Sequence, residues 1–172
     1  TVNVASDDPD EDPYDYAIEG NGIVQDIDVQ GNSQSIVDGD TTPDAADDTD
    51  FGDVNEAGAT LTRIFTIENT GTDTLNLTGA SPVSITGTHP GDFTVTAQPA
   101  DLVLAPGETT TFEIQFDPSV LGGRSATVNV ASDDPDEDPY DYAIEGNGIV
   151  QDIDVQGNSQ SIVDGDTTPD AA

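Results

Sequence analysis

The stretch LAPGETTTFEIQF, residues 104–116, decides the fold class of this chain. It opens with an Ala-Pro-Gly turn signal and continues with Phe112, Ile114 and Phe116 at every second position. Successive side chains of a β-strand point to opposite faces, so this spacing places the three apolar side chains on one face. The stretch therefore predicts a turn followed by a half-buried strand.

The same alternation recurs on both sides of this stretch, and turn signals such as Asn69-Thr70-Gly71 separate the runs. The side chains expected to face the core are Ile27, Val29, Phe65, Ile67, Leu75, Leu77, Val83, Ile85, Phe93, Val95, Ala126, Val128, Val130, Tyr140, Tyr142 and Ile144. Short alternating strands without helical periodicity are typical of a two-sheet antiparallel architecture. The sequence therefore predicts an all-β, immunoglobulin-like antiparallel β-sandwich of seven to eight strands.

An internal repeat sets the domain organisation. Residues 1–46 reappear letter for letter as residues 127–172, so the period is 126 residues, which suits an independent domain. We cut the period at the Gly-Asn-Gly of residues 20–22 and 146–148, where we expect a strand to end and a flexible joint to follow. The chain is then a slice of a tandem array expected to continue beyond both ends. The predicted regions are 1–22 (C-terminal strands of a preceding repeat), 23–148 (a complete immunoglobulin-like repeat) and 149–172 (the N-terminal strand and loop of the following repeat).

The charge balance excludes several classes of partner. The chain has 36 acidic residues against two arginines and a net charge of −34, so nucleic acid and anionic membrane surfaces would repel it. No apolar stretch approaches the roughly 18 residues of a membrane span, so we expect no direct membrane insertion. The absence of cysteine excludes disulfides, thiolate metal sites and thiol catalysis.

Four runs carry a family resemblance: DGDTTPDAADDTDFGDV (38–54), FTIENTGTDTLNLTG (65–79), HPGDFTV (89–95), and the long segment 104–148 that begins LAPGETTTF and ends AIEGNG. Together they resemble the hydin-type, major-sperm-protein-like immunoglobulin repeats of prokaryotic choice-of-anchor D surface proteins. The resemblance covers essentially the whole period. It implies a sandwich with a structural or adhesive role at the cell surface or outside the cell, and no shared catalytic residues.

Aspartates concentrate in two segments between the predicted strands. The candidate metal ligands are Asp38, Asp40, Asp44, Asp47, Asp48 and Asp50 in the first segment, and Asp133, Asp134, Asp136 and Asp138 in the second. Ca²⁺ takes six to eight oxygen ligands from carboxylates and loop carbonyls, so the clusters predict Ca²⁺ as a cofactor. Two alternatives stay open: the aspartates cap turns, or they reflect adaptation to a salty host. The second accounts for the total charge better than for its clustering.

Topology suggests how the two clusters relate. If the first strand runs the length of the sandwich, the loop at 38–53 lies where the chain leaves the repeat, and the hairpin at 132–139 lies where it enters. The clusters of consecutive repeats would then meet across the joint, where a metal ion would stiffen it.

The remaining polar residues have simpler interpretations. Arg63 and Arg124 are expected to pair with nearby carboxylates, and His89 to be a turn residue. Paired carboxylates can hydrolyse glycosides, but short loops on a small sandwich offer little cleft, so we predict no enzyme.

The predicted function is therefore structural: an extended extracellular fibre, stalk or filament, stiffened by Ca²⁺ near repeat junctions. Its partners would be neighbouring repeats of the same chain or identical chains. The alternative is an adhesin module that binds surface glycans or other surfaces.

Overall fold

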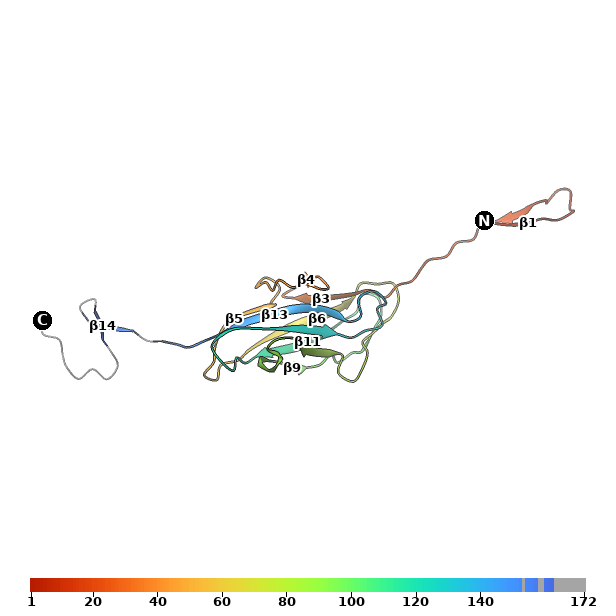
Figure 1. The fold of residues 1–172 in the computed structure, drawn as a ribbon. Coiled ribbons are helices and arrows are strands. Elements are labelled where there is room, and N and C mark those ends of the chain that lie inside the picture. The colour runs from red at the N-terminus through yellow and green to blue at the C-terminus, as the bar shows by residue number, and fades with distance from the viewer. Residues whose placement is uncertain (153, 158–159, 163–172) are drawn as a thin grey trace.

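A computed structural model describes residues 1–152, 154–157 and 160–162 and consists of a β-sandwich with a short hairpin beyond each end (Figure 1). One sheet has five strands in the order β4-β3-β6-β11-β9, and the other has four in the order β5-β13-β12-β8. The five-stranded sheet comprises β3 (Ile27–Gly31), β4 (Gln34–Ile36), β6 (Leu61–Asn69), β9 (Phe93–Ala97) and β11 (Thr109–Phe116). The four-stranded sheet comprises β5 (Asp50–Asn55), β8 (Val83–Thr86), β12 (Gly122–Val130) and β13 (Tyr140–Ile149). A small pair joins β7 (Leu75–Asn76) to β10 (Val103–Leu104), and a 3-10 turn, η1, spans Pro90–Asp92.

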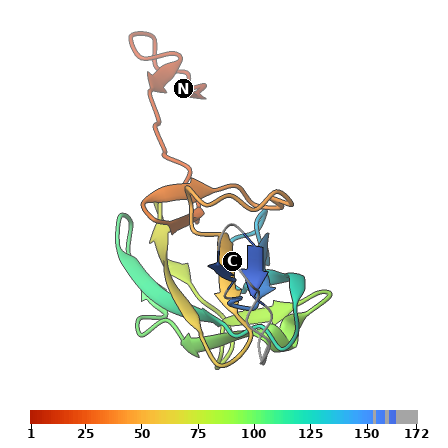
Figure 2. The same ribbon diagram turned by 90° about the vertical axis from the view of Figure 1, so that its left-hand side faces the viewer.

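The predicted all-β sandwich is confirmed, and the two layers are visible along the long axis in Figure 2. The structure adds three strands that the alternation does not indicate: β4, β5 and β10. It also contains parallel pairing along β13, which runs in the same direction as β5 and forms a parallel bridge between Tyr142 and Asp40. No helix within the described residues is long and apolar enough to cross a membrane.

Alternation predicts the core correctly. Every side chain expected inside is buried except Ile85 and Val95, which are partly buried and pack against the core. The structure adds Ile36, Phe51, Val54 and Leu104 to it. Apolar area removed from water stabilises the fold by about 25 cal/mol per Å², so this continuous core is the main favourable contribution. Two buried tyrosines differ in their polar ends: the Tyr140 hydroxyl donates to the Ile36 carbonyl, whereas the Tyr142 hydroxyl has no partner among the described residues.

The hairpins beyond the sandwich repeat parts of it in a different environment. The pair β1 (Val2–Val4) and β2 (Tyr14–Tyr16) copies the adjoining ends of β12 and β13, and β14 (Val155–Gly157) with β15 (Gln160–Ile162) copies β3 with β4. The registers are the same in both copies, but Tyr16 is 49% exposed whereas Tyr142, its copy in the sandwich, is 1% exposed. Hairpin register is therefore local, and burial requires the rest of the repeat. Residues 163–172, part of the predicted third region, lie outside the described residues.

The predicted strand end lies close to the observed one, because β13 ends at Ile149, but the Gly-Asn-Gly of residues 146–148 is not itself a loose joint. These residues belong to β13 and pair with β12, and Asn147 and Gly148 pair with β5 as well. A Cβ on Gly146 would lie 2.5 Å from Phe116 Cε1, and one on Gly148 would lie 2.3 Å from the Val120 carbonyl oxygen. Glycine is needed here because neighbours approach closely, and its presence reflects packing instead of flexibility.

Candidate functional site

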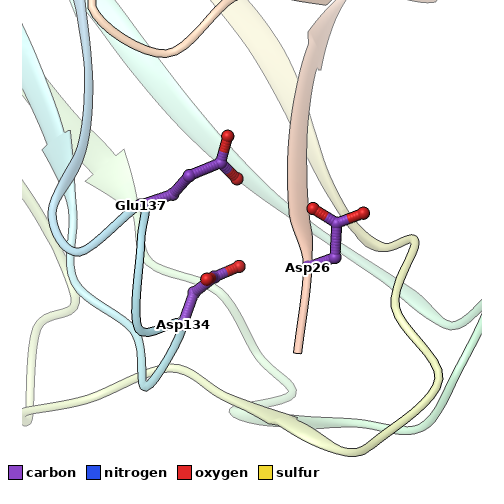
Figure 3. A group of neighbouring side chains, drawn as sticks. All are labelled: Asp26, Asp134 and Glu137. Carbon is purple, nitrogen blue, oxygen red and sulfur yellow. The ribbon is translucent and has the colours of Figure 1, made fainter. Parts of the chain in front are cut away.

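Three carboxylates come together at the N-terminal pole, which we define as the end of the sandwich where β3 begins. Asp26 immediately precedes β3, and Asp134 and Glu137 lie on the loop that leads into β13 (Figure 3). Each offers one carboxylate oxygen, and the three oxygens lie within 4.8 Å of one another. Figure 3 shows the two loop side chains directed toward the strand that carries Asp26. This is the spacing at which a single hard cation is able to contact all three groups.

Backbone hydrogen bonds hold Asp134 in this position. The Ile27 N–H donates to its Oδ2 atom at 3.0 Å, and the Asp136 N–H donates to its Oδ1 atom at 3.3 Å. The side chain is almost wholly buried, with the residue 2% exposed. Desolvation is the main cause that raises the pKa of Asp134, although the backbone donors from Asp136 and Ile27 oppose it. The loop thus fixes a buried carboxylate beside the first strand.

Glu137 is the member of the three whose buried carboxylate oxygen, Oε2, lacks a hydrogen-bond donor among the described residues. Burial, followed by repulsion from Asp134, Asp26, Asp38 and Asp136, raises the pKa of Glu137 from 4.5 to about 6. At neutral pH the site therefore holds several negative charges, the described arginines form their ion pairs elsewhere, and a bound cation would relieve the repulsion.

The first aspartate segment begins near the N-terminal pole, contrary to the prediction, and only its end, at Asp53 beside Asn147, reaches toward the far pole. The chain turns back after β3 to form β4, so it returns toward the N-terminal pole before it crosses to the other sheet. It then runs beside the first half of β13: Asp38 Oδ1 accepts from the Asp141 N–H at 2.8 Å, and the Asp40 carbonyl accepts from the Ala143 N–H at 2.7 Å. The start of the first cluster therefore lies near the second within one repeat, where Asp38 contributes to the charge around Glu137. The later members lie farther along the sandwich, since the Asp47 carbonyl lies beside Gly31 at the end of β3 and Asp50 pairs with Glu145.

Most of the predicted ligands accept hydrogen bonds from nearby groups, as the turn-capping interpretation expects. The aspartates that accept from the residue two positions on are Asp40 (from Thr42), Asp44 (from Ala46), Asp47 (from Thr49) and Asp50 (from Gly52). Asp138 accepts from the Ser132 N–H, and Asp133 from the backbone and side chain of Asn76. The backbone N–H of Asp136 lies at the site, where it donates to Asp134 Oδ1. Among the ten predicted ligands, Asp134 alone belongs to the three-carboxylate group in the described part of the chain.

Both arginines form the predicted ion pairs. Arg63 lies 3.0 Å from Asp48, whose φ of 64° turns the loop toward it. Arg124 Nε donates to Asp92 Oδ2 at 2.5 Å, and Asp92 is 4% exposed. Burial alone would raise the pKa of Asp92, but hydrogen bonds from Ser119 and Arg124 lower it overall.

Two members of the three-carboxylate group were absent from the predicted ligands. Asp26 resembles an ordinary outward-facing residue beside the first strand, and Glu137 is one acid among several in its loop. What brings them together is the bond between the Ile27 N–H and Asp134, which joins residues far apart in the chain. The sequence does contain one local indication of the site: Asp134 and Glu137 stand three positions apart in the same acidic loop.

The fold and this polar end define an immunoglobulin-like domain with an acidic pole. The profile of the HYDIN/CFA65/VesB-like Ig-like domain family matches residues 44–147, more than half of the chain, and the chain belongs to that family. The predicted family is thereby confirmed. Membership indicates a structural or protein-interaction module, and domains of this family are generally non-catalytic.

Several solved structures are similar to the chain. A protein of unknown function from Porphyromonas gingivalis W83 is 18% identical, with a TM-score of 0.48 over 73% of this chain and 46% of that one. The VesB protease of Vibrio cholerae is 17% identical, with a TM-score of 0.45 over 57% of this chain and 29% of that one. The ASH/PapD-like domain of human CEP192 is 15% identical, with a TM-score of 0.43 over 81% of this chain and 97% of that one. The chain thus spans less than half of the Porphyromonas and Vibrio structures, and a search of curated proteins found no match.

Proposed function

We propose that this chain is a structural segment of an extended extracellular or cell-surface fibre, stalk or filament, built from immunoglobulin-like repeats in series. The letter-for-letter repeat of residues 1–46 at 127–172 supports serial copies of one domain. In the complete repeat, β3 begins at one pole and β13 ends at the opposite pole, and the flanking hairpins lie beyond opposite ends (Figure 1). Domains connected in this way add length with each copy, and the partners of one repeat are the neighbouring repeats.

We further propose that Ca²⁺ binds at the N-terminal pole, between Asp26, Asp134 and Glu137. The observation that carries this proposal is the buried Oε2 atom of Glu137, which lacks a donor among the described residues while two carboxylates face it. Calcium accepts irregular oxygen shells that include loop carbonyls and water, so three converging carboxylates are a suitable nucleus. A cation there would tie the loop before β13 to the residue that precedes β3, close to the junction with the preceding repeat.

The chain contains one complete set of these ligands. Residues Asp8 and Glu11 copy Asp134 and Glu137 in the first hairpin, and Asp152 copies Asp26 in the last segment. In the intact set Asp26 stands far before Asp134 in the chain, and the equivalent partners of both copies fall outside the 172 residues. A calorimetric titration of the 172-residue chain with Ca²⁺ should therefore saturate at one strong site. Unselective condensation on a surface of net charge −34 would instead give many weak sites that salt removes.

Matched substitutions separate the site from the general charge. Glu137→Gln should abolish the strong isotherm, while Glu145→Gln, the same change at an exposed position in β13, should leave it intact. Equal affinity in both variants, or a stoichiometry well above one, would reject the site. The fibre proposal is tested separately by electron microscopy of longer arrays, where compact or branched particles would contradict it.

A further inference from the structure

Hydrogen bonds of the complete repeat reach both residues that would meet at a junction between consecutive repeats. At the end of β13 the Ile149 carbonyl accepts from the Glu56 N–H at 2.9 Å, so the last strand residue is held by its own repeat. Residue 150 copies Val24, and Val24 is already held by the repeat that follows it. Its N–H donates to Thr72 Oγ1 at 3.2 Å, and its carbonyl accepts from the Thr72 and Asp73 N–H groups at 2.9 and 3.0 Å.

The turn that holds Val24 is shaped for this contact. A Cβ on Gly71 would lie 2.4 Å from the Val24 carbonyl oxygen and 2.7 Å from the Asp26 nitrogen, so glycine lets the turn close over residues 24–26. The Thr70 N–H donates to the Asp26 carbonyl at 2.9 Å, which extends the contact up to the start of β3. Hydrogen bonds therefore hold the segment directly after the junction against its own repeat.

We propose that a single peptide group, Ile149–Val150, clamps consecutive repeats end to end. Its carbonyl is bound by Glu56 of one repeat, and its N–H is bound by the counterpart of Thr72 in the next. A peptide group is planar and resists rotation about its C–N bond, so the two anchors are rigidly related. This inference rests on the proposed serial arrangement and makes stiffness a property of the hydrogen bonds on this peptide group, independent of any cation.

The clamp also identifies the surfaces that meet. With no spacer, the C-terminal pole of one repeat must face the turn at residues 69–73 of the next. Val120 and Leu121 lie at that pole, where the Val120 carbonyl packs against Gly148, and they are 51% and 53% exposed. The partner that covers these two apolar side chains is the next copy of the repeat, because the chain itself delivers that copy to this position.

The test uses the chain extended by one further period, so that a second complete repeat follows Ile149. The protein has no cysteine, so one cysteine at the exposed Thr94 position of each repeat permits site-specific spin labelling. Double electron–electron resonance then reports the distribution of distances between repeats. The comparison variant carries Gly-Ser-Gly between Ile149 and Val150, which adds about 10 Å of flexible reach.

We expect a narrow distribution for the parent in both EDTA and Ca²⁺, and a broad one for the insertion variant in both. A parent as broad as the insertion variant in EDTA would overturn the clamp. If the parent narrows only with Ca²⁺, the clamp fails and the proposed cation site stands; if it is narrow in EDTA and unchanged by Ca²⁺, the clamp stands and stiffening by the cation fails. Thr72→Val in both repeats should broaden the distribution relative to Thr111→Val, and equal widths would overturn the role assigned to Thr72.

Discussion

Replacement of Glu137 by glutamine should stabilise the protein in the absence of Ca²⁺ and remove its response to Ca²⁺. The substitution keeps the shape of the side chain and deletes its charge, which in the native protein lies buried among carboxylates. Most substitutions at a well-packed polar site destabilise a protein, so a gain in stability would be informative about electrostatics. The expected gain arises because the native state holds the ionised glutamate at an unfavourable potential.

The magnitude follows from the raised pKa of Glu137, about 6 against 4.5. Each pKa unit corresponds to about 1.4 kcal/mol, so ionised Glu137 costs the native state at most about 2 kcal/mol, and about 1 kcal/mol once solvent screening of this partly exposed residue is included. The pKa is higher in the folded state, so the folded state binds the proton more tightly. The cost is therefore absent below pH 4.5, grows as the pH rises, and is complete above about pH 6.

Urea unfolding at pH 7.5 and pH 4 measures this directly, with Glu145→Gln as the control for the loss of one charge from a highly acidic chain. In EDTA, Glu137→Gln should be more stable than the parent by about 1 kcal/mol at pH 7.5 and equal to it at pH 4. At a free Ca²⁺ concentration 100 times its Kd, the parent should gain about 2.7 kcal/mol and the variant should not. A Glu137→Gln protein that is less stable than the parent in EDTA at pH 7.5 would refute the reasoning, because the carboxylate would then be a favourable structural group.

Further substitutions test the packing, the ion pairs and a buried hydroxyl by urea unfolding. Gly146→Ala should destabilise the protein by about 1–3 kcal/mol because the new Cβ overlaps a phenylalanine ring, whereas Gly20→Ala, the same change in the flanking copy, should be neutral; equal effects would contradict the packing role. Arg124→Ala should cost about 3 kcal/mol near neutral pH because it leaves a buried aspartate unpaired, and Arg63→Ala, at a more exposed pair, less than about 1 kcal/mol. The cost of Arg124→Ala should shrink as the pH falls and the aspartate is protonated, and a cost that does not depend on pH would assign it to lost packing. Tyr142→Phe should be neutral or stabilising because its buried hydroxyl has no partner among the described residues, and a loss above about 1 kcal/mol would reveal an ordered partner.

Local periodicity explains which parts of the fold were predictable. Strand β11 alternates over its whole length and β12 from Ala126 onward, so the face they bury can be read from their own residues. In contrast, β4 and β5 are short edge strands inside or next to an aspartate-rich segment, and their pairing is determined by β3 and β13. The error in placing the first aspartate cluster follows from this, because an unrecognised hairpin reverses the direction of the chain.

The candidate site was predictable only in part for a related reason. Clustering indicates which segments are acidic, but capping and metal binding use the same residue type in the same loops. Asp40 and Asp47 accept hydrogen bonds from their own turns. Asp134 instead accepts from Ile27, which begins β3 in the other sheet. Only the tertiary contact separates these cases, and it also brings in Asp26.

The duplicated segment separates local from tertiary determinants within one molecule. Its hairpins keep the same register with or without the remaining strands, so those turns are encoded locally. The Gly-Asn-Gly tripeptide behaves differently: residues 20–22 lie outside any strand, whereas residues 146–148 extend β13. The strands that pair with residues 146–148, β5 and the start of β12, lie in residues 47–126, which the duplicated segment lacks. The junction is therefore ordered by the body of the preceding repeat, so stiffness of an array would require that each repeat be complete.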